Sequence, residues 1–98
     1  MDTTGVSNAA FQPKIVVHSK PMCVQCNATQ RMLDKLGLEY ETIDVTKADE
    51  ALQYLKSLGY QAAPVVLVYE DDATEPTKHW SGYRPDELKR LSRATVAA

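Results

Sequence analysis

Residues 14–26 read KIVVHSKPMCVQC, an apolar run that leads into the two cysteines of the chain. The β-branched residues at 15–17 are typical of a strand that is buried on both faces of a sheet. From residue 24 to residue 36 the apolar residues recur at helical spacing, and Gly37 provides a stop. Cys23 and Cys26 therefore lie at the boundary between a predicted strand and a predicted helix.

A cysteine at the start of a helix is well placed for redox chemistry. Unpaired backbone N–H groups and the helix dipole favour negative charge there, so we expect the thiolate of Cys23 to be stabilised. The thiolate is the reactive form of the side chain. Cys26 follows one turn later, close enough to form a disulfide with Cys23, and points back toward the strand, which suits a resolving role.

The chain continues as an alternation of strands and helices. Residues 39–45 alternate in polarity and predict a second strand, parallel to the first and reached through a right-handed crossover. Thr46 and Asp49 resemble a capping box at the start of a second helix, which is expected to end at Gly59. Strand, helix and strand together predict a βαβ unit.

The C-terminal half predicts two more strands and a third helix. Residues 65–69, VVLVY, are the most apolar segment, and Pro64 stands at its entrance, where proline is tolerated and the X-Pro bond can be cis. An acidic turn at 70–77 leads to a short return strand at 78–80, which suits an antiparallel hairpin. Pro85, followed by two acids, matches a helix start. The predicted order is β-α-β-α-β-β-α, an α/β fold.

The composition indicates one small domain of 98 residues. A net charge of -2 arises from 11 basic and 13 acidic residues mixed along the chain, which argues against a nucleic-acid surface or a polybasic membrane anchor. No stretch is long enough to span a bilayer, and the N-terminus does not resemble a secretory signal. We expect a monomeric cytoplasmic protein with a flexible extension at 1–12, a domain at 13–94 and a frayed end at 95–98.

Several segments are similar to those of one family. A βαβ unit that carries C-x-x-C, followed by a ββα unit with a proline before its first strand, resembles the thioredoxin fold. That fold has a central four-stranded mixed sheet and three helices. More specific segments resemble the NrdH redoxins, which are glutaredoxin-sized proteins with thioredoxin-like activity. These segments are 23–29 (CVQCNAT), 58–60 (LGY), 63–66 (APVV) and 79–85 (HWSGYRP).

The resemblance implies an electron carrier. Such a protein takes electrons from thioredoxin reductase, at the expense of NADPH, and passes them to the large subunit of a class Ib ribonucleotide reductase. The flavin and the nicotinamide would belong to the reductase, and the chain has no glycine-rich dinucleotide motif. We therefore expect no bound cofactor beyond a redox-active Cys23–Cys26 disulfide. Three features depart from the family pattern: the N-terminal extension, the long acidic turn at 70–77, and Tyr83 in place of the commoner phenylalanine.

The expected roles of the residues follow from this chemistry. Cys23 would attack a disulfide of the substrate protein, and Cys26 would release the reduced product. Pro64 would pack beside the disulfide, whereas Trp80 is either part of a partner-binding patch or a cover of the core. Lys20 either supports the thiolate or is a solvated loop lysine. The predicted substrate- and partner-binding residues are Lys20, Val24, Gln25, Ala63, Pro64, Trp80, Ser81, Gly82, Tyr83, Arg84 and Pro85.

Two other functions also use C-x-x-C. A glutathione-dependent glutaredoxin shares the fold, but Gln25 stands where that family often has tyrosine, and the pair at 81–82 replaces its usual two glycines. A zinc or iron–sulfur module normally needs four ligands, and the chain has a single C-x-x-C pair. His18 and His79 lie at unsuitable sequence distances to complete such a site and are expected to be structural. We therefore expect no metal site.

Overall fold

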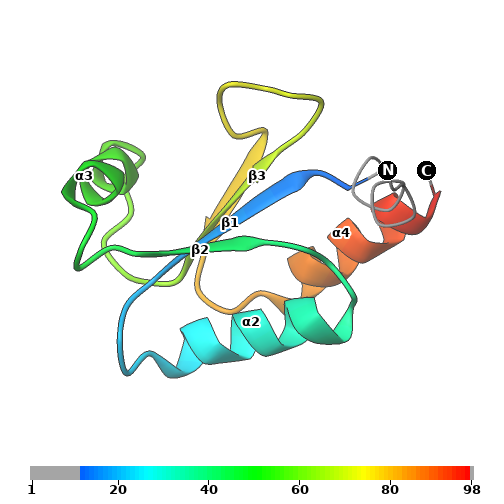
Figure 1. The fold of residues 1–98 in the computed structure, drawn as a ribbon, viewed down its shortest axis with the longest axis horizontal. Helices are drawn as coiled ribbons and strands as arrows, with labels where there is room; N and C mark the ends of the chain where they lie inside the picture. Colours follow the sequence, from blue (N-terminus) through cyan, green and yellow to red (C-terminus); the bar gives the residue numbers. More distant parts are fainter. Residues whose placement is uncertain (1–11, 98) are drawn as a thin grey trace, which may run out of the picture.

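The fold is built on a four-stranded sheet that helices cover on both faces (Figure 1). The structure, a computed structural model, describes residues 12–97. The predicted flexible extension at 1–12 lies, apart from Gln12, outside the described residues. Gln12 exchanges two hydrogen bonds with the backbone of Glu39, at 2.6 and 2.8 Å. Packed structure therefore begins one residue before the predicted domain limit.

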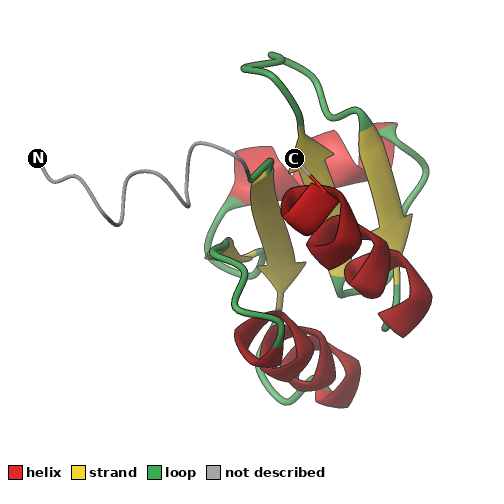
Figure 2. Cartoon of the chain, turned by 90° about the vertical axis from the view of Figure 1, so that its right-hand side faces the viewer, coloured by secondary structure: helices red, strands yellow, loops and turns green. Residues whose placement is uncertain are grey.

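The helices and strands follow the predicted order. Their bounds are β1 (Lys14–Ser19), α2 (Val24–Lys35), β2 (Glu41–Asp44), α3 (Asp49–Ser57), β3 (Val65–Tyr69), β4 (Lys78–Ser81) and α4 (Pro85–Ala97). The strand order in the sheet is β2-β1-β3-β4. The β1–β2 pair is parallel and the other two pairs are antiparallel, which confirms the predicted mixed sheet. Helix α4 lies across the strands (Figure 2) and continues beyond the predicted domain limit at residue 94.

The two central strands, β1 and β3, are apolar on both faces of the sheet. Successive side chains of a strand point to opposite faces, so each strand contributes to two clusters. Helices α2 and α4 cover one face and α3 covers the other (Figure 1). The first cluster contains Ile15, Val17, Leu33, Leu38, Val66, Val68, Trp80, Leu88 and Leu91, and the second contains Leu55, Val65 and Leu67.

The ends of the helices show one confirmed prediction and one error. Gly37 follows the C-cap residue Leu36 of α2 and adopts a φ of 73°, as the predicted stop requires. The predicted capping box of α3 is wrong, because its N-cap residue is Ala48 and no side chain caps the helix. The Thr46 hydroxyl instead donates to Asp44 Oδ1 at 2.6 Å. Asp44 also accepts the Thr46 N–H, which makes a local turn at the end of β2.

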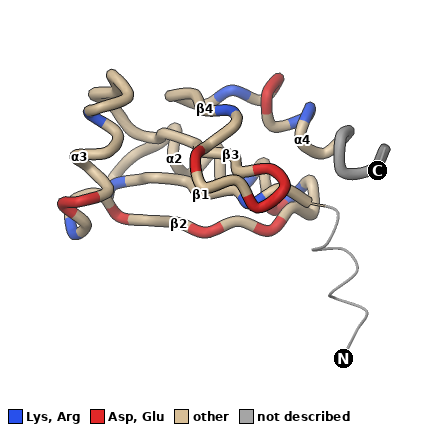
Figure 3. The backbone as a smooth tube through the Cα atoms, turned by 90° about the horizontal axis from the view of Figure 1, so that it is seen from above, with Lys and Arg blue, Asp and Glu red and all other residues tan. Residues whose placement is uncertain are grey.

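Charged residues are distributed over the surface. Figure 3 shows Asp and Glu along β2 and in the turn after β3, with Lys and Arg spread over several elements rather than gathered in one stripe. Within the described part of the chain, no helix combines the length and the apolar character needed to cross a bilayer.

His18, near the end of β1, is a buried titratable residue with 4% of its surface exposed. Its Nδ1–H donates to the carbonyl oxygen of Val65 at 3.4 Å. Burial lowers the pKa of His18, and the hydrogen bond to Val65 opposes this shift only in part. The unfolded state therefore binds a proton at a higher pH than the folded state, so acidification below about pH 6.5 destabilises the fold.

We predict that the free energy of unfolding falls between about pH 7.5 and pH 5 more steeply for the native chain than for His18→Asn. The asparagine amide can still donate a hydrogen bond, but it does not titrate. Urea denaturation at each pH measures the effect. The two proteins differ only at residue 18, so the difference between the two curves isolates His18. Parallel curves would contradict the prediction.

Candidate active site

The two cysteines form a disulfide at the N-terminus of α2, with Cα atoms 5.2 Å apart. Cys23 is the N-cap residue, and the backbone N–H of Cys26 donates to Cys23 Sγ at 3.2 Å. The first turn of α2 contains no acidic residue. The helix end thus directs partial positive charge at Cys23 Sγ without an opposing carboxylate in that turn, an arrangement that stabilises a thiolate.

The surroundings of the two sulfur atoms differ. Cys23 retains 8% of its surface exposed and Cys26 retains 1%. On either side of Cys23, Met22 is 99% exposed and Val24 is 78% exposed. The more accessible cysteine therefore has an exposed apolar margin. Sequence reasoning selected Val24 but missed Met22, because an apolar residue in a loop carries no sign of whether its side chain turns inward or outward.

Pro64 lies directly before β3, as the sequence indicated. The Ala63–Pro64 peptide bond is cis, and Pro64 is buried. The Pro64 carbonyl oxygen accepts a hydrogen bond from the Gly82 N–H at 2.8 Å. This bond joins the entrance of β3 to the residue that follows β4, so two parts of the predicted site are held together.

Gln25, between the two cysteines, joins the same segment to α2. Its Oε1 accepts a hydrogen bond from the Tyr83 N–H at 3.0 Å. Gly82 has a φ of 86°, and a Cβ at that position would lie 3.2 Å from Gln25 Oε1, so glycine suits both the backbone and the close approach. Gln25 thus acts as a tether between the C-x-x-C helix and the segment that follows β4.

Trp80 faces inward, into the core. It is 6% exposed and belongs to the core cluster between the sheet and helices α2 and α4. Its indole N–H is buried and has no hydrogen-bond partner among the described residues. Tyr83 is half-buried and packs against the same cluster. The structure therefore places both aromatic side chains where they support the segment from within.

The remaining residues of this segment are more accessible. Ser81 donates to the Ala62 carbonyl at 3.5 Å. Arg84 is exposed and donates two hydrogen bonds to Asp86, at 3.1 and 2.9 Å. These bonds lower the pKa of Asp86 to about 2. Pro85 is the first residue of α4, so it also serves as a helix start.

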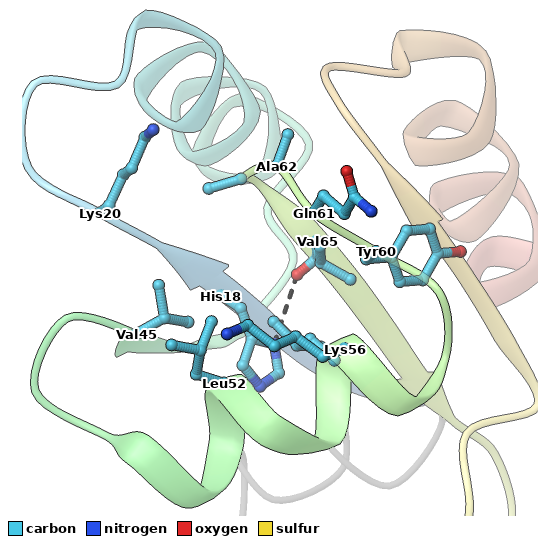
Figure 4. A pocket seen from close by; sticks show the side chains of 11 residues that line it. His18, Lys20, Val45, Leu52, Lys56, Tyr60, Gln61, Ala62 and Val65 are labelled. Atoms are coloured by element: carbon cyan, nitrogen blue, oxygen red, sulfur yellow. Dashed lines mark hydrogen bonds between the residues drawn. The ribbon is translucent and has the colours of Figure 1, made fainter.

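Lys20, in the loop after β1, lines a pocket of about 180 Å³, and in Figure 4 its side chain extends away from α3. The pocket is also lined by Leu52, Lys56, Tyr60 and Ala63, and none of the described acidic residues lines it. In Figure 4, Lys56 extends from α3 toward β1. The pocket thus offers an apolar wall with two cationic side chains. Among the described residues, no group of three His, Cys, Asp or Glu side chains is placed to hold a metal ion.

The tether by Gln25 yields a prediction. Gln25→Ala removes the acceptor of the Tyr83 N–H and should cost about 0.5–1.5 kcal/mol of stability. The Tyr83 amide should also exchange faster with solvent, as measured by hydrogen exchange and NMR. Gln25→Glu keeps an acceptor oxygen and serves as the matched control. An unchanged exchange rate of Tyr83 in Gln25→Ala would show that the hydrogen bond does not hold the segment.

Comparisons with known proteins agree with this arrangement. The family model named Glutaredoxin matches residues 15–72. The glutaredoxin-like protein NrdH of Escherichia coli K12 is 35% identical over 85 residues, which are 87% of this chain and 96% of that protein. The Gene 56 protein of Mycobacterium phage D29 is 34% identical over 82 residues, 83% of each chain.

A solved structure shows the same fold. It is that of the E. coli NrdH-redoxin, described as a glutaredoxin-like protein with a thioredoxin-like activity profile. The match has a TM-score of 0.70 at 35% identity and covers 80% of this chain and 93% of that chain. The fold is thus the predicted thioredoxin fold, and the chain belongs to the NrdH family of glutaredoxin-like thiol-disulfide oxidoreductases, with Cys23 and Cys26 as its redox-active pair.

Proposed function

We propose that the chain is the electron donor of a class Ib ribonucleotide reductase and that thioredoxin reductase, using NADPH, returns it to the dithiol form. The observation that carries the proposal is the disulfide of Cys23 and Cys26 at the start of α2 in a chain 35% identical to E. coli NrdH. The acceptor disulfide would belong to the large subunit of the ribonucleotide reductase. The dithiol form of Cys23 and Cys26 carries the two electrons that are transferred, so the chain would need no other cofactor.

In the first step, the Cys23 thiolate attacks one sulfur of the acceptor disulfide. A bond forms between Cys23 Sγ and that sulfur, the acceptor S–S bond breaks, and the second acceptor sulfur leaves as a thiolate that takes up a proton. The greater exposure of Cys23 and its position as the N-cap residue support its role as the attacking group.

In the second step, Cys26 loses its proton and attacks Cys23 Sγ. The Cys23–Cys26 disulfide forms, and the remaining acceptor sulfur leaves and is protonated. Two electrons have then passed to the acceptor. The nearly complete burial of Cys26 suits this role, because its attack is intramolecular and needs no access for a second protein. Thioredoxin reductase would supply two electrons to restore the dithiol.

The predicted binding residues complete the proposal. Val24 and Gln25 would contact the partner beside the sulfur, and the backbone of Ala63 would pair with an extended segment of the partner. A second contact would come from the segment after β4, with residues Ser81, Gly82, Tyr83, Arg84 and Pro85. Trp80 would support this segment from the core. Lys20 would contribute positive charge to the partner contact. A C-x-x-C pair that works as a dithiol fits a reducing compartment, so we also propose a cytoplasmic location. We further propose that the protein acts as a monomer.

The assignment of the two cysteines is tested by substitution. Cys23→Ser should abolish disulfide reduction, because no accessible nucleophile remains. Cys26→Ser should attack but not resolve, and should accumulate a mixed disulfide in a one-to-one ratio, detected by mass spectrometry of the intact complex. Circular dichroism of both variants verifies that they fold. A mixed disulfide through Cys26 in the Cys23→Ser protein would reverse the two roles.

A glutathione-dependent activity is the second candidate function. In the part of the chain that the structure describes, the pocket next to Ala63 is lined by Lys20 and Lys56 and by no acidic residue, and glutathione is a peptide with two carboxylates. The observation in its favour is this charge pattern. Against it stands Gln25, because glutaredoxins often have tyrosine at this position. Here the Gln25 side chain accepts the Tyr83 N–H and lies close to Gly82.

The electron source is tested by following NADPH oxidation with a disulfide acceptor. One reaction contains thioredoxin reductase, and the other contains glutathione and glutathione reductase. We expect turnover with thioredoxin reductase to exceed that with the glutathione system by at least about tenfold, a difference of about 1.4 kcal/mol in the activation barrier. Cys23→Ser is the control for both reactions. Equal turnover in the two systems would favour the glutathione-dependent function.

A further inference from the structure

Met22 has the largest exposed fraction of the large hydrophobic side chains in the described part of the chain, 99%. It directly precedes Cys23, and Val24 on the other side is 78% exposed. Single apolar residues at a surface are ordinary, but two that flank a nucleophile form an apolar margin around the reacting sulfur. The side chain of Met22 gains almost nothing from packing within its own chain.

The backbone of Met22 is also unusual. Its φ is 58°, in the left-handed region that residues with a Cβ seldom adopt. Among the described residues, two other non-glycine residues share this property, Asp71 with a φ of 54° and Asp72 with a φ of 61°. Aspartate tolerates the conformation because its short polar side chain can hydrogen-bond locally, whereas methionine has no such compensation. The fold therefore bears a cost at Met22 without an internal benefit from the side chain.

We infer that Met22 determines substrate specificity: its thioether side chain packs on a large apolar residue that flanks the reactive cysteine of the acceptor protein. The inference rests on the proposed function, because it requires a mixed disulfide at Cys23. In that intermediate the acceptor sulfur is bonded to Cys23 Sγ, so the neighbours of the acceptor cysteine lie over the neighbours of Cys23. A flexible and polarizable thioether adapts well to such a contact.

The test uses the reduced full-length chain in single-turnover reactions without any reductase. Two disulfide-bonded peptides serve as acceptors, identical except that leucine or serine flanks the cysteine that is attacked. We expect the leucine peptide to be reduced about tenfold faster, which corresponds to about 1.4 kcal/mol. Burial of one apolar side chain in a contact is sufficient for a difference of this size.

Variants at residue 22 separate the side chain from the backbone. Met22→Gln keeps the length and the backbone constraint but is polar, and it should reduce the preference for leucine from about tenfold to about twofold. Met22→Leu should retain the preference. Asp72→Gly is the matched control, because it alters another positive-φ residue in the turn at the far end of β3, and it should keep the preference of the native chain.

Met22→Gly relieves the backbone constraint and removes the contact together. Since an exposed side chain offers no packing to lose, the thermal midpoint should rise by about 2–4 °C while the preference for leucine disappears. A preference for leucine that persists in Met22→Gly would overturn the inference.

The outcomes distinguish this inference from the function on which it rests. Equal rates with the two peptides in the native chain, or an unchanged preference in Met22→Gln, would overturn the role of Met22 and leave the dithiol chemistry intact. Failure of the native reduced chain to reduce either peptide would refute the proposed dithiol function itself.

Discussion

The antiparallel pairing of β1 and β3 places His18 opposite Val65, so the end of β1 and the start of β3 lie at the same edge of the sheet. The redox pair and Pro64 are attached to that edge. The loop after β1 leads to Cys23, and Pro64 stands directly before β3. Both strands are apolar on their two faces, which suits them to the centre of the sheet.

The helix that begins at this edge favours negative charge on Cys23. Its N-terminus directs the Cys26 N–H and a partial positive charge at Cys23 Sγ. A helix dipole contributes about 0.3–1 kcal/mol at an exposed site and up to about 2 kcal/mol where the group is partly buried. The upper value is enough to favour the thiolate by more than about tenfold. Cys23 is mostly withdrawn from solvent, where screening is weaker.

The segment after β4 owes its position to two hydrogen bonds. Gln25 Oε1 accepts the Tyr83 N–H, and the Pro64 carbonyl accepts the Gly82 N–H. The first bond anchors the segment to the C-x-x-C helix, and the second anchors it to the entrance of β3. Gln25 therefore has a structural task as well as its place between the two cysteines. The Trp80 side chain packs in the core, so the segment combines a buried aromatic side chain with accessible residues such as Arg84.

Much of this protein was determined by short-range patterns in its sequence. The order of the elements and the reactive cysteines follow from the apolar runs at 15–17 and 65–69, from Gly37 and from the C-x-x-C pair, because burial and helix termination depend on a few neighbouring residues. Thr46 shows the limit of such reasoning. The sequence pattern predicts that Thr46 caps α3, whereas in the structure its hydroxyl donates to Asp44. The inward orientation of Trp80, the tether at Gln25 and the exposure of Met22 were decided by the tertiary structure. Each depends on groups brought together from distant parts of the chain, or on a backbone conformation that no local pattern announces.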